Sequence, residues 1–102
     1  MGLAKPIIVI VDDEIEILNA LQRLLKSLPV EVFPFEKPQQ ALDFIKDHDV
    51  ELVVSDHRMP EIKGIELLKA IKDVKPNISR VLLSAHQDFD DVALGFNEGV
   101  ID

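Results

Sequence analysis

The stretch Ile7-Ile8-Val9-Ile10-Val11-Asp12-Asp13 joins an uninterrupted run of β-branched residues to two acids. A continuous apolar run of this length is typical of a strand that is buried on both faces, as in a parallel sheet covered by helices. In open parallel sheets, ligands bind outside the carboxyl ends of the strands. This stretch therefore predicts both a central strand and the position of a functional site.

The rest of the chain alternates short apolar runs with amphipathic segments. The expected later strands are 30–33, 52–54 and 81–83, and the expected helices are 15–28, 38–47, 65–75 and 88–96. Pro29 is expected to end the first helix, whose inward face would carry Ile15, Leu18, Leu21, Leu25 and Leu28. The order βαβαβαβα predicts an α/β fold with a parallel sheet, in one domain over residues 1–102.

The ends of these strands carry the residues of chemical interest. The first strand runs into Asp12 and Asp13, the third ends at Asp56 and the fourth at Ser84. Carboxylates brought close together repel one another, so such a site recruits a cation or takes up a proton. Oxygen ligands without His or Cys suit Mg²⁺, Mn²⁺ or Ca²⁺. A phosphoryl-transfer site fits this set, with Asp56 as nucleophile, although each acid taken singly is also typical of a helix cap.

Composition excludes several classes of protein. The chain of 102 residues has a formal net charge of -8 and no cysteine, so disulfides and thiolate chemistry are absent. A surface this acidic repels nucleic-acid phosphate and anionic lipid, so we expect no direct nucleic-acid or membrane partner. The apolar run at residues 7–11 is shorter than the roughly 7–15 residues of a signal-peptide core and the roughly 20 of a membrane span. A cytoplasmic location is expected.

Four segments together resemble the receiver domain of response regulators, of the CheY-like kind. They are Val9-Ile10-Val11-Asp12-Asp13-Glu14, Ser55-Asp56-His57-Arg58-Met59-Pro60, Gly64, and Val81-Leu82-Leu83-Ser84-Ala85. They cover the whole chain in order and at the family's spacing. The resemblance implies a flavodoxin-like, doubly wound sheet of strand order 2-1-3-4(-5), and a phospho-acceptor switch that takes its phosphoryl group from a histidine kinase, a phosphotransfer protein or a small donor such as acetyl phosphate.

The resemblance also implies a role for each matching residue. Asp56 would be the phospho-acceptor, Asp13 a direct ligand of Mg²⁺ (or Mn²⁺) and Asp12 a ligand largely through water, with the backbone carbonyl of Arg58 completing the set. Ser84 would be the switch hydroxyl. The side chains of Arg58 and His86 would tune the lifetime of the phosphorylated state, or be ordinary solvated residues. Asn19, Gln22 and Arg23 would face the kinase.

The family pattern is incomplete in this chain. A receiver continues with a fifth strand that ends in a Lys, and then with a fifth helix, whereas this chain stops at Val100-Ile101-Asp102. We therefore expect a domain that is incomplete at its C-terminus, with the fourth strand left as a sheet edge. Such a chain would be part of a longer protein or form a homodimer, for instance by exchanging its last helix.

Three other functions are alternatives. An aspartate-nucleophile phosphatase would need Asp-x-Asp after the first strand, and a nucleotide-binding domain would need a glycine-rich loop there; neither motif is present. A receiver relic that only dimerises or docks remains open, and metal binding would distinguish it from a working switch. We expect no turnover enzyme, because a receiver promotes only its own phosphorylation and dephosphorylation.

Overall fold

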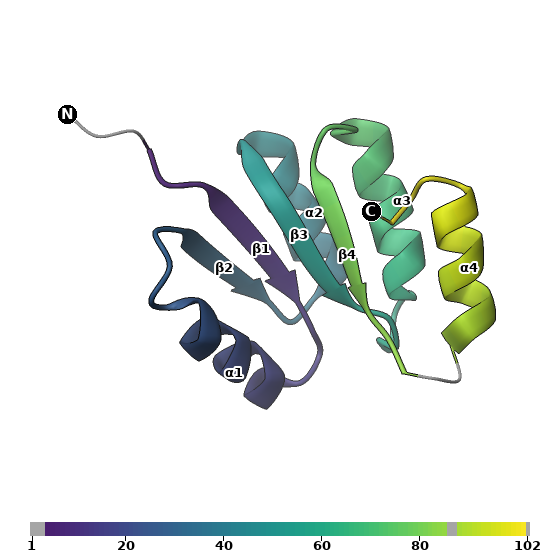
Figure 1. Ribbon diagram of the computed structural model, residues 1–102, viewed down its shortest axis with the longest axis horizontal. Helices are drawn as coiled ribbons and strands as arrows, with labels where there is room; N and C mark the ends of the chain where they lie inside the picture. The colour runs from purple at the N-terminus through teal and green to yellow at the C-terminus, as the bar shows by residue number, and fades with distance from the viewer. Residues whose placement is uncertain (1–3, 86–87, 102) are drawn as a thin grey trace.

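The structure is a computed structural model that describes residues 4–85 and 88–101. In this part of the chain, four parallel strands alternate with four helices (Figure 1). The elements are β1 (Ile7–Val11), α1 (Ile15–Leu25), β2 (Glu31–Phe35), α2 (Pro38–Asp47), β3 (Val50–Asp56), α3 (Gly64–Val74), β4 (Ser79–Leu83) and α4 (Phe89–Asn97). The sheet order is β2-β1-β3-β4. The predicted fold class and strand order are confirmed.

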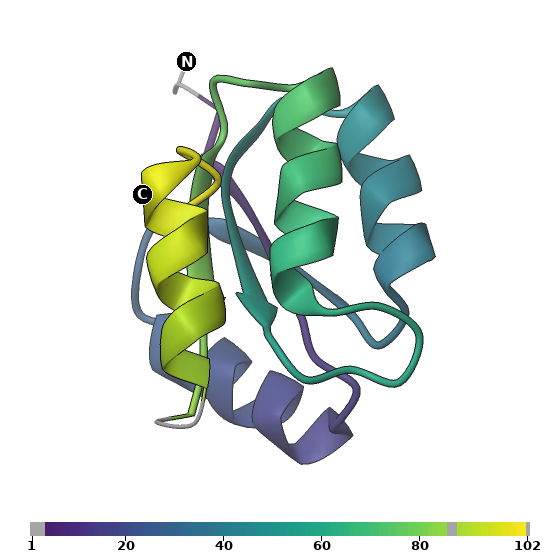
Figure 2. The same cartoon turned by 90° about the vertical axis from the view of Figure 1, so that its right-hand side faces the viewer.

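Side chains of β1 alternate between two apolar layers, because successive residues of a strand point to opposite faces. Val9 and Val11 pack with α2 and α3, whereas Ile8 and Ile10 pack with Leu18 of α1. Figures 1 and 2 show α2 and α3 on one face of the sheet and α1 on the other, with α4 beside α3. Helices cover both faces of the sheet, and the strand order makes β1 and β3 its two central strands. None of the helices among the described residues has the length and apolar character that a bilayer crossing requires.

Two local predictions were wrong. The first helix ends at Leu25 rather than near Pro29, and the side chains of Ile15 and Leu28, expected to face inward, are 48% and 50% exposed. The second strand runs through Pro34, which pairs with Ile10, whereas the sequence indicated an end before the proline. A proline fits here because β2 is an edge strand, where a missing N–H removes no ladder hydrogen bond on the free side.

The other edge strand is β4, as expected. Val81 and Leu83 lie on it half-exposed, whereas Arg80 is buried. The Arg80 guanidinium donates hydrogen bonds to four backbone carbonyls. Two belong to Pro76 and Ile78, just before β4, and two to Gly99 and Val100, just after α4. These bonds hold the segment after α4 against β4, and Val100 and Ile101 are buried there. The homodimer stays a prediction.

Candidate functional site

The acidic residues converge at the carboxyl edge of the sheet. Asp12 and Asp13 directly follow β1, and Asp56 is the last residue of β3. Because β1 and β3 pair in register, with Val11 opposite Ser55, Asp12 and Asp56 leave the sheet side by side. Carboxylate oxygens of Asp12, Asp13 and Asp56 all lie within 4.8 Å of one another. The structure therefore brings together the three carboxylates that the sequence placed at this edge.

The three carboxyl groups differ in their surroundings. Asp12 is 3% exposed, and its Oδ1 accepts a hydrogen bond from the Glu14 backbone N–H at 2.9 Å. Burial raises the pKa of Asp12 in spite of that bond, and the Asp13 charge adds to the rise. Burial also raises the pKa of Asp56, followed by repulsion from Asp12. Asp13 is exposed. Both shifts mean that the site resists carrying its full negative charge.

A divalent cation would relieve this repulsion. The donor set consists of hard oxygens, and spacings below 4.8 Å allow several of them to reach one ion. Magnesium in particular uses one or two carboxylates and keeps several waters, which suits a site that opens to solvent at Asp13. The three residues therefore fit a magnesium ion.

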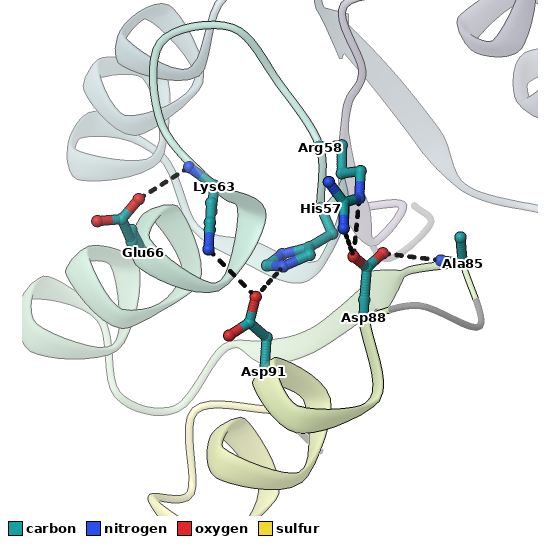
Figure 3. Close-up of polar contacts among 7 residues, drawn as sticks. All are labelled: His57, Arg58, Lys63, Glu66, Ala85, Asp88 and Asp91. Atoms are coloured by element: carbon teal, nitrogen blue, oxygen red, sulfur yellow. Dashed lines mark hydrogen bonds and ion pairs between the residues drawn. The ribbon is translucent and has the colours of Figure 1, made fainter.

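The remaining predicted residues lie near this edge. Ser84 is exposed and directly follows β4, in which Leu83 pairs with Asp56. Arg58 lies in the loop between β3 and α3, and its side chain turns toward α4 (Figure 3). His86 lies outside the described residues. The roles of Ser84, Arg58 and His86 stay predictions.

Comparison with known proteins identifies the family. The sequence model described as the response regulator receiver domain matches residues 8–102. The chain belongs to this family. Each motif of the acidic edge falls within the matched residues, so the resemblance inferred from Asp12, Asp13, Asp56 and Ser84 is confirmed at the level of the family.

Individual relatives of this receiver domain agree with the family match. The transcriptional regulatory protein ZraR of Klebsiella oxytoca is 34% identical over 95 residues, and the DNA-binding transcriptional regulator NtrC of Klebsiella pneumoniae is 32% identical over 93. These cover 93% and 91% of this chain but only 21% and 20% of those proteins, so the receiver domain spans about a fifth of the length of the curated relatives. The signal receiver domain of an HD domain-containing protein from Pseudomonas fluorescens Pf-5 superposes with a TM-score of 0.89 at 34% identity, covering 99% of this chain and 74% of that one.

A glycine fixes how the receiver domain's loop leaves Asp56. The Gly64 N–H donates to the His57 carbonyl at 2.7 Å, which folds the loop back on β3. A Cβ atom at Gly64 would lie 2.2 Å from the Asp56 carbonyl oxygen. Only glycine allows this close approach, so the start of α3 is held against the end of β3.

Asp88, directly before α4, and Asp91 of α4 fasten the same loop, and sequence reasoning missed both contacts (Figure 3). The buried His57 donates from Nε2 to Asp91 at 2.9 Å, and the Lys63 ammonium approaches the same Asp91 oxygen at 3.3 Å. Hydrogen bonds from His57 and then Lys63 lower the pKa of Asp91. The His57 Nδ1 has no hydrogen-bond partner among the described residues. Strand alternation offered one clue, because His57 continues the buried face of Ser55.

The second fastening runs from Arg58 to Asp88. The Arg58 guanidinium contacts one Asp88 carboxylate oxygen at 2.7 Å and 2.8 Å, and the Ala85 backbone N–H donates to the other at 2.9 Å. Burial alone would raise the pKa of Asp88, but the bonds from Ala85 and Arg58 outweigh it and lower the pKa. The loop after β3 and the start of α4 are thus joined by charged groups.

Proposed function

We propose that this receiver domain accepts a phosphoryl group on Asp56 and acts as the switch of a two-component response regulator. The observation that carries the proposal is the position of Asp56 at the tip of a central strand, with two further carboxylates within 4.8 Å. Membership of the receiver family supports the same assignment. The donor would be a phosphohistidine of a histidine kinase or phosphotransfer protein, or a small acyl phosphate.

The transfer is a displacement at phosphorus. A carboxylate oxygen of Asp56 forms the new P–O bond while the donor's P–N bond breaks, and the imidazole nitrogen of the donor keeps the electron pair. A Mg²⁺ ion held by Asp12, Asp13, Asp56 and the Arg58 carbonyl would offset the charge of the transferring group. Asp56 must be ionised to attack; burial and the Asp12 charge raise its pKa, and a nearby cation would favour the ionised form. The phosphoryl group is lost when water attacks phosphorus and Asp56 leaves as the carboxylate.

Ser84 would read the modified state. Ser84 directly follows β4, which pairs with the strand that carries Asp56, and its side chain is exposed to solvent. A hydroxyl can donate to a phosphoryl oxygen, so phosphorylation would draw Ser84 toward Asp56. Ala85 and α4 follow Ser84 along the chain, so this movement would pass to α4.

The surface of the domain indicates where a kinase would bind and that nucleic acid would not bind directly. Asn19, Gln22 and Arg23 of α1 line a groove with Val30 and Val32 at the start of β2, and we propose that the kinase docks on this face of the helix. Nucleic acid would be contacted by another part of a longer protein, because this segment carries a net charge of -8. The domain would turn over no phosphate ester of its own accord.

Intact mass after incubation with acetyl phosphate and Mg²⁺ tests the proposal. One phosphoryl group should be gained, and the gain should be absent from an Asp56→Asn chain and from a reaction with excess chelator. A gain that persists in Asp56→Asn would move the acceptor to another residue. No gain in the presence of Mg²⁺, either from acetyl phosphate or from a phosphorylated kinase, would favour a module that only docks or dimerises.

A further inference from the structure

One buried carboxylate links the two segments that flank the acidic edge. Asp88 is 3% exposed although Arg58, which it binds, has a side chain that is 62% exposed. The other Asp88 oxygen accepts the Ala85 N–H at 2.9 Å, and the Asp88 N–H donates to the Ala85 carbonyl at 3.0 Å. Asp88 thus holds both the residue two positions after Asp56 and the residue next to Ser84 (Figure 3).

We propose that Asp88 is a positioning residue, a latch that holds Arg58 and the Ser84–Ala85 segment in the unphosphorylated arrangement until a phosphoryl group on Asp56 takes Arg58 away from it. The proposal rests on the proposed function, because the phosphoryl group is the competitor.

The competition follows from the charges. Asp88 offers Arg58 one carboxylate oxygen, whereas a phosphoryl group carries a charge of about -1.5 to -2 and three strong acceptor oxygens. Guanidinium groups bind phosphate in a two-pronged geometry that a single carboxylate oxygen does not provide. Arg58 is mostly exposed, so its present pair is weak enough to exchange partners.

Release of Arg58 would leave the rest of the contact network in place. Asp91 keeps its bonds to His57 and Lys63, so α4 stays attached to the loop by its second fastening. Ala85 and Asp88 lose their tie to Arg58, so the loop after β3 no longer restrains Ser84 and Ala85 through Asp88. The latch therefore acts on the position of Ser84 rather than on the fold.

Beryllofluoride, a stable phosphoryl analogue, measures the latch when it is titrated in the presence of Mg²⁺. An Asp88→Asn chain keeps an amide oxygen to accept the Ala85 N–H but loses the charge that holds Arg58. We expect it to bind the analogue about fivefold more tightly than the wild type, which corresponds to a surface ion pair. Damage to the fold would not produce tighter binding. In an Arg58→Gln background the same substitution should change the affinity less than about twofold, because the partner is gone.

The matched control is Asp90→Asn, which removes the same charge from an exposed residue two positions further on, in the first turn of α4. A gain in Asp90→Asn as large as in Asp88→Asn would assign the effect to net charge and overturn the latch. Unchanged or weaker binding by Asp88→Asn would overturn it as well. In the metal-free chain, Arg58 Nε–H exchange should be faster in Asp88→Asn than in the wild type. If the wild type binds no beryllofluoride, the proposed function fails, and the latch falls with it.

Discussion

Replacing Asp56 with Asn should make the metal-free receiver domain more stable, although it removes the residue on which the proposed function depends. In the wild type, three carboxylates approach within 4.8 Å of one another without a cation. The substitution removes one of the three charges while keeping the size and shape of the side chain. The free energy of unfolding should therefore rise.

The size of the gain follows from the spacing. Two unit charges at 4.8 Å repel by about 0.9 kcal/mol at a dielectric constant of about 80 and by about 3.5 kcal/mol at about 20. Asp56→Asn removes two such pairs, those with Asp12 and Asp13. Asp13 is exposed and Asp56 is only half-buried, so we apply the weaker value to both pairs, which together give about 2 kcal/mol. We expect a gain of about 2 kcal/mol at neutral pH and low salt, or roughly 10 °C in the melting temperature of a domain of this size.

Urea unfolding in chelator, followed by circular dichroism from pH 3 to 8, measures the gain. The raised pKa values of Asp12 and Asp56 make the folded wild type bind more protons than the unfolded chain above the ordinary value of 3.8. Wild-type stability should therefore fall as the pH rises through those raised values. The advantage of Asp56→Asn should be complete above that window and disappear toward pH 3.

An acidic residue at the opposite end of the sheet supplies the control. Asp49 is exposed and precedes β3, so Asp49→Asn makes the same change in net charge without touching the acidic edge. A gain of equal size in both variants, or a gain in Asp56→Asn that is unchanged at pH 3, would refute local repulsion as the cause. Added Mg²⁺ should stabilise the wild type more than Asp56→Asn and so narrow the difference.

Three other results are expected. Asp13→Asn should lower the affinity for Mg²⁺ by at least about tenfold, measured by the shift of the melting temperature with metal concentration, since one of the few carboxylate ligands is lost. Gly64→Ala should cost about 3 kcal/mol in urea unfolding, because the new Cβ would meet the Asp56 carbonyl at 2.2 Å; an unchanged midpoint would show that the loop yields. Arg80→Met should cost about 3 kcal/mol in the same assay by leaving buried carbonyls without a donor, and Arg80→Lys should recover part of it.

The sequence was sufficient for features that depend on local pattern. The strand at Ile7–Val11 is continuous and apolar, and the topology of a parallel sheet brings the ends of such strands to one edge, so the meeting of Asp12 with Asp56 followed. Helix boundaries and faces were less certain, because Leu18 alone of α1 is fully buried and tertiary packing decides which neighbours are covered.

Apart from the strand alternation that places His57 on a buried face, contacts between distant segments left no signal in the pattern. Asp88 and Asp91 are acidic residues at the start of a helix, where acids are common for reasons of the helix dipole. Their partners Arg58 and His57 lie 30 and 34 residues earlier, and only the packing of α4 beside α3 brings them together. The contacts of Arg80 could not be predicted for the same reason, since a charged residue inside a short strand gave no indication that backbone carbonyls would surround it.

The Arg80 bonds give α4 the mechanics of a lever. They fix the Gly99 and Val100 carbonyls just past one end of the helix, and the Lys72 ammonium holds the Glu98 carbonyl at 2.9 Å. The nine residues of α4 extend about 14 Å from that fulcrum, so a tilt of about 10° moves the far end by about 2 Å. That displacement would part a contact of 2.8 Å such as that between Arg58 and Asp88, and the bonds of Asp91 to His57 and Lys63 in the first turn of the helix oppose it. A small angular change at the pivot is thus amplified at the acidic edge.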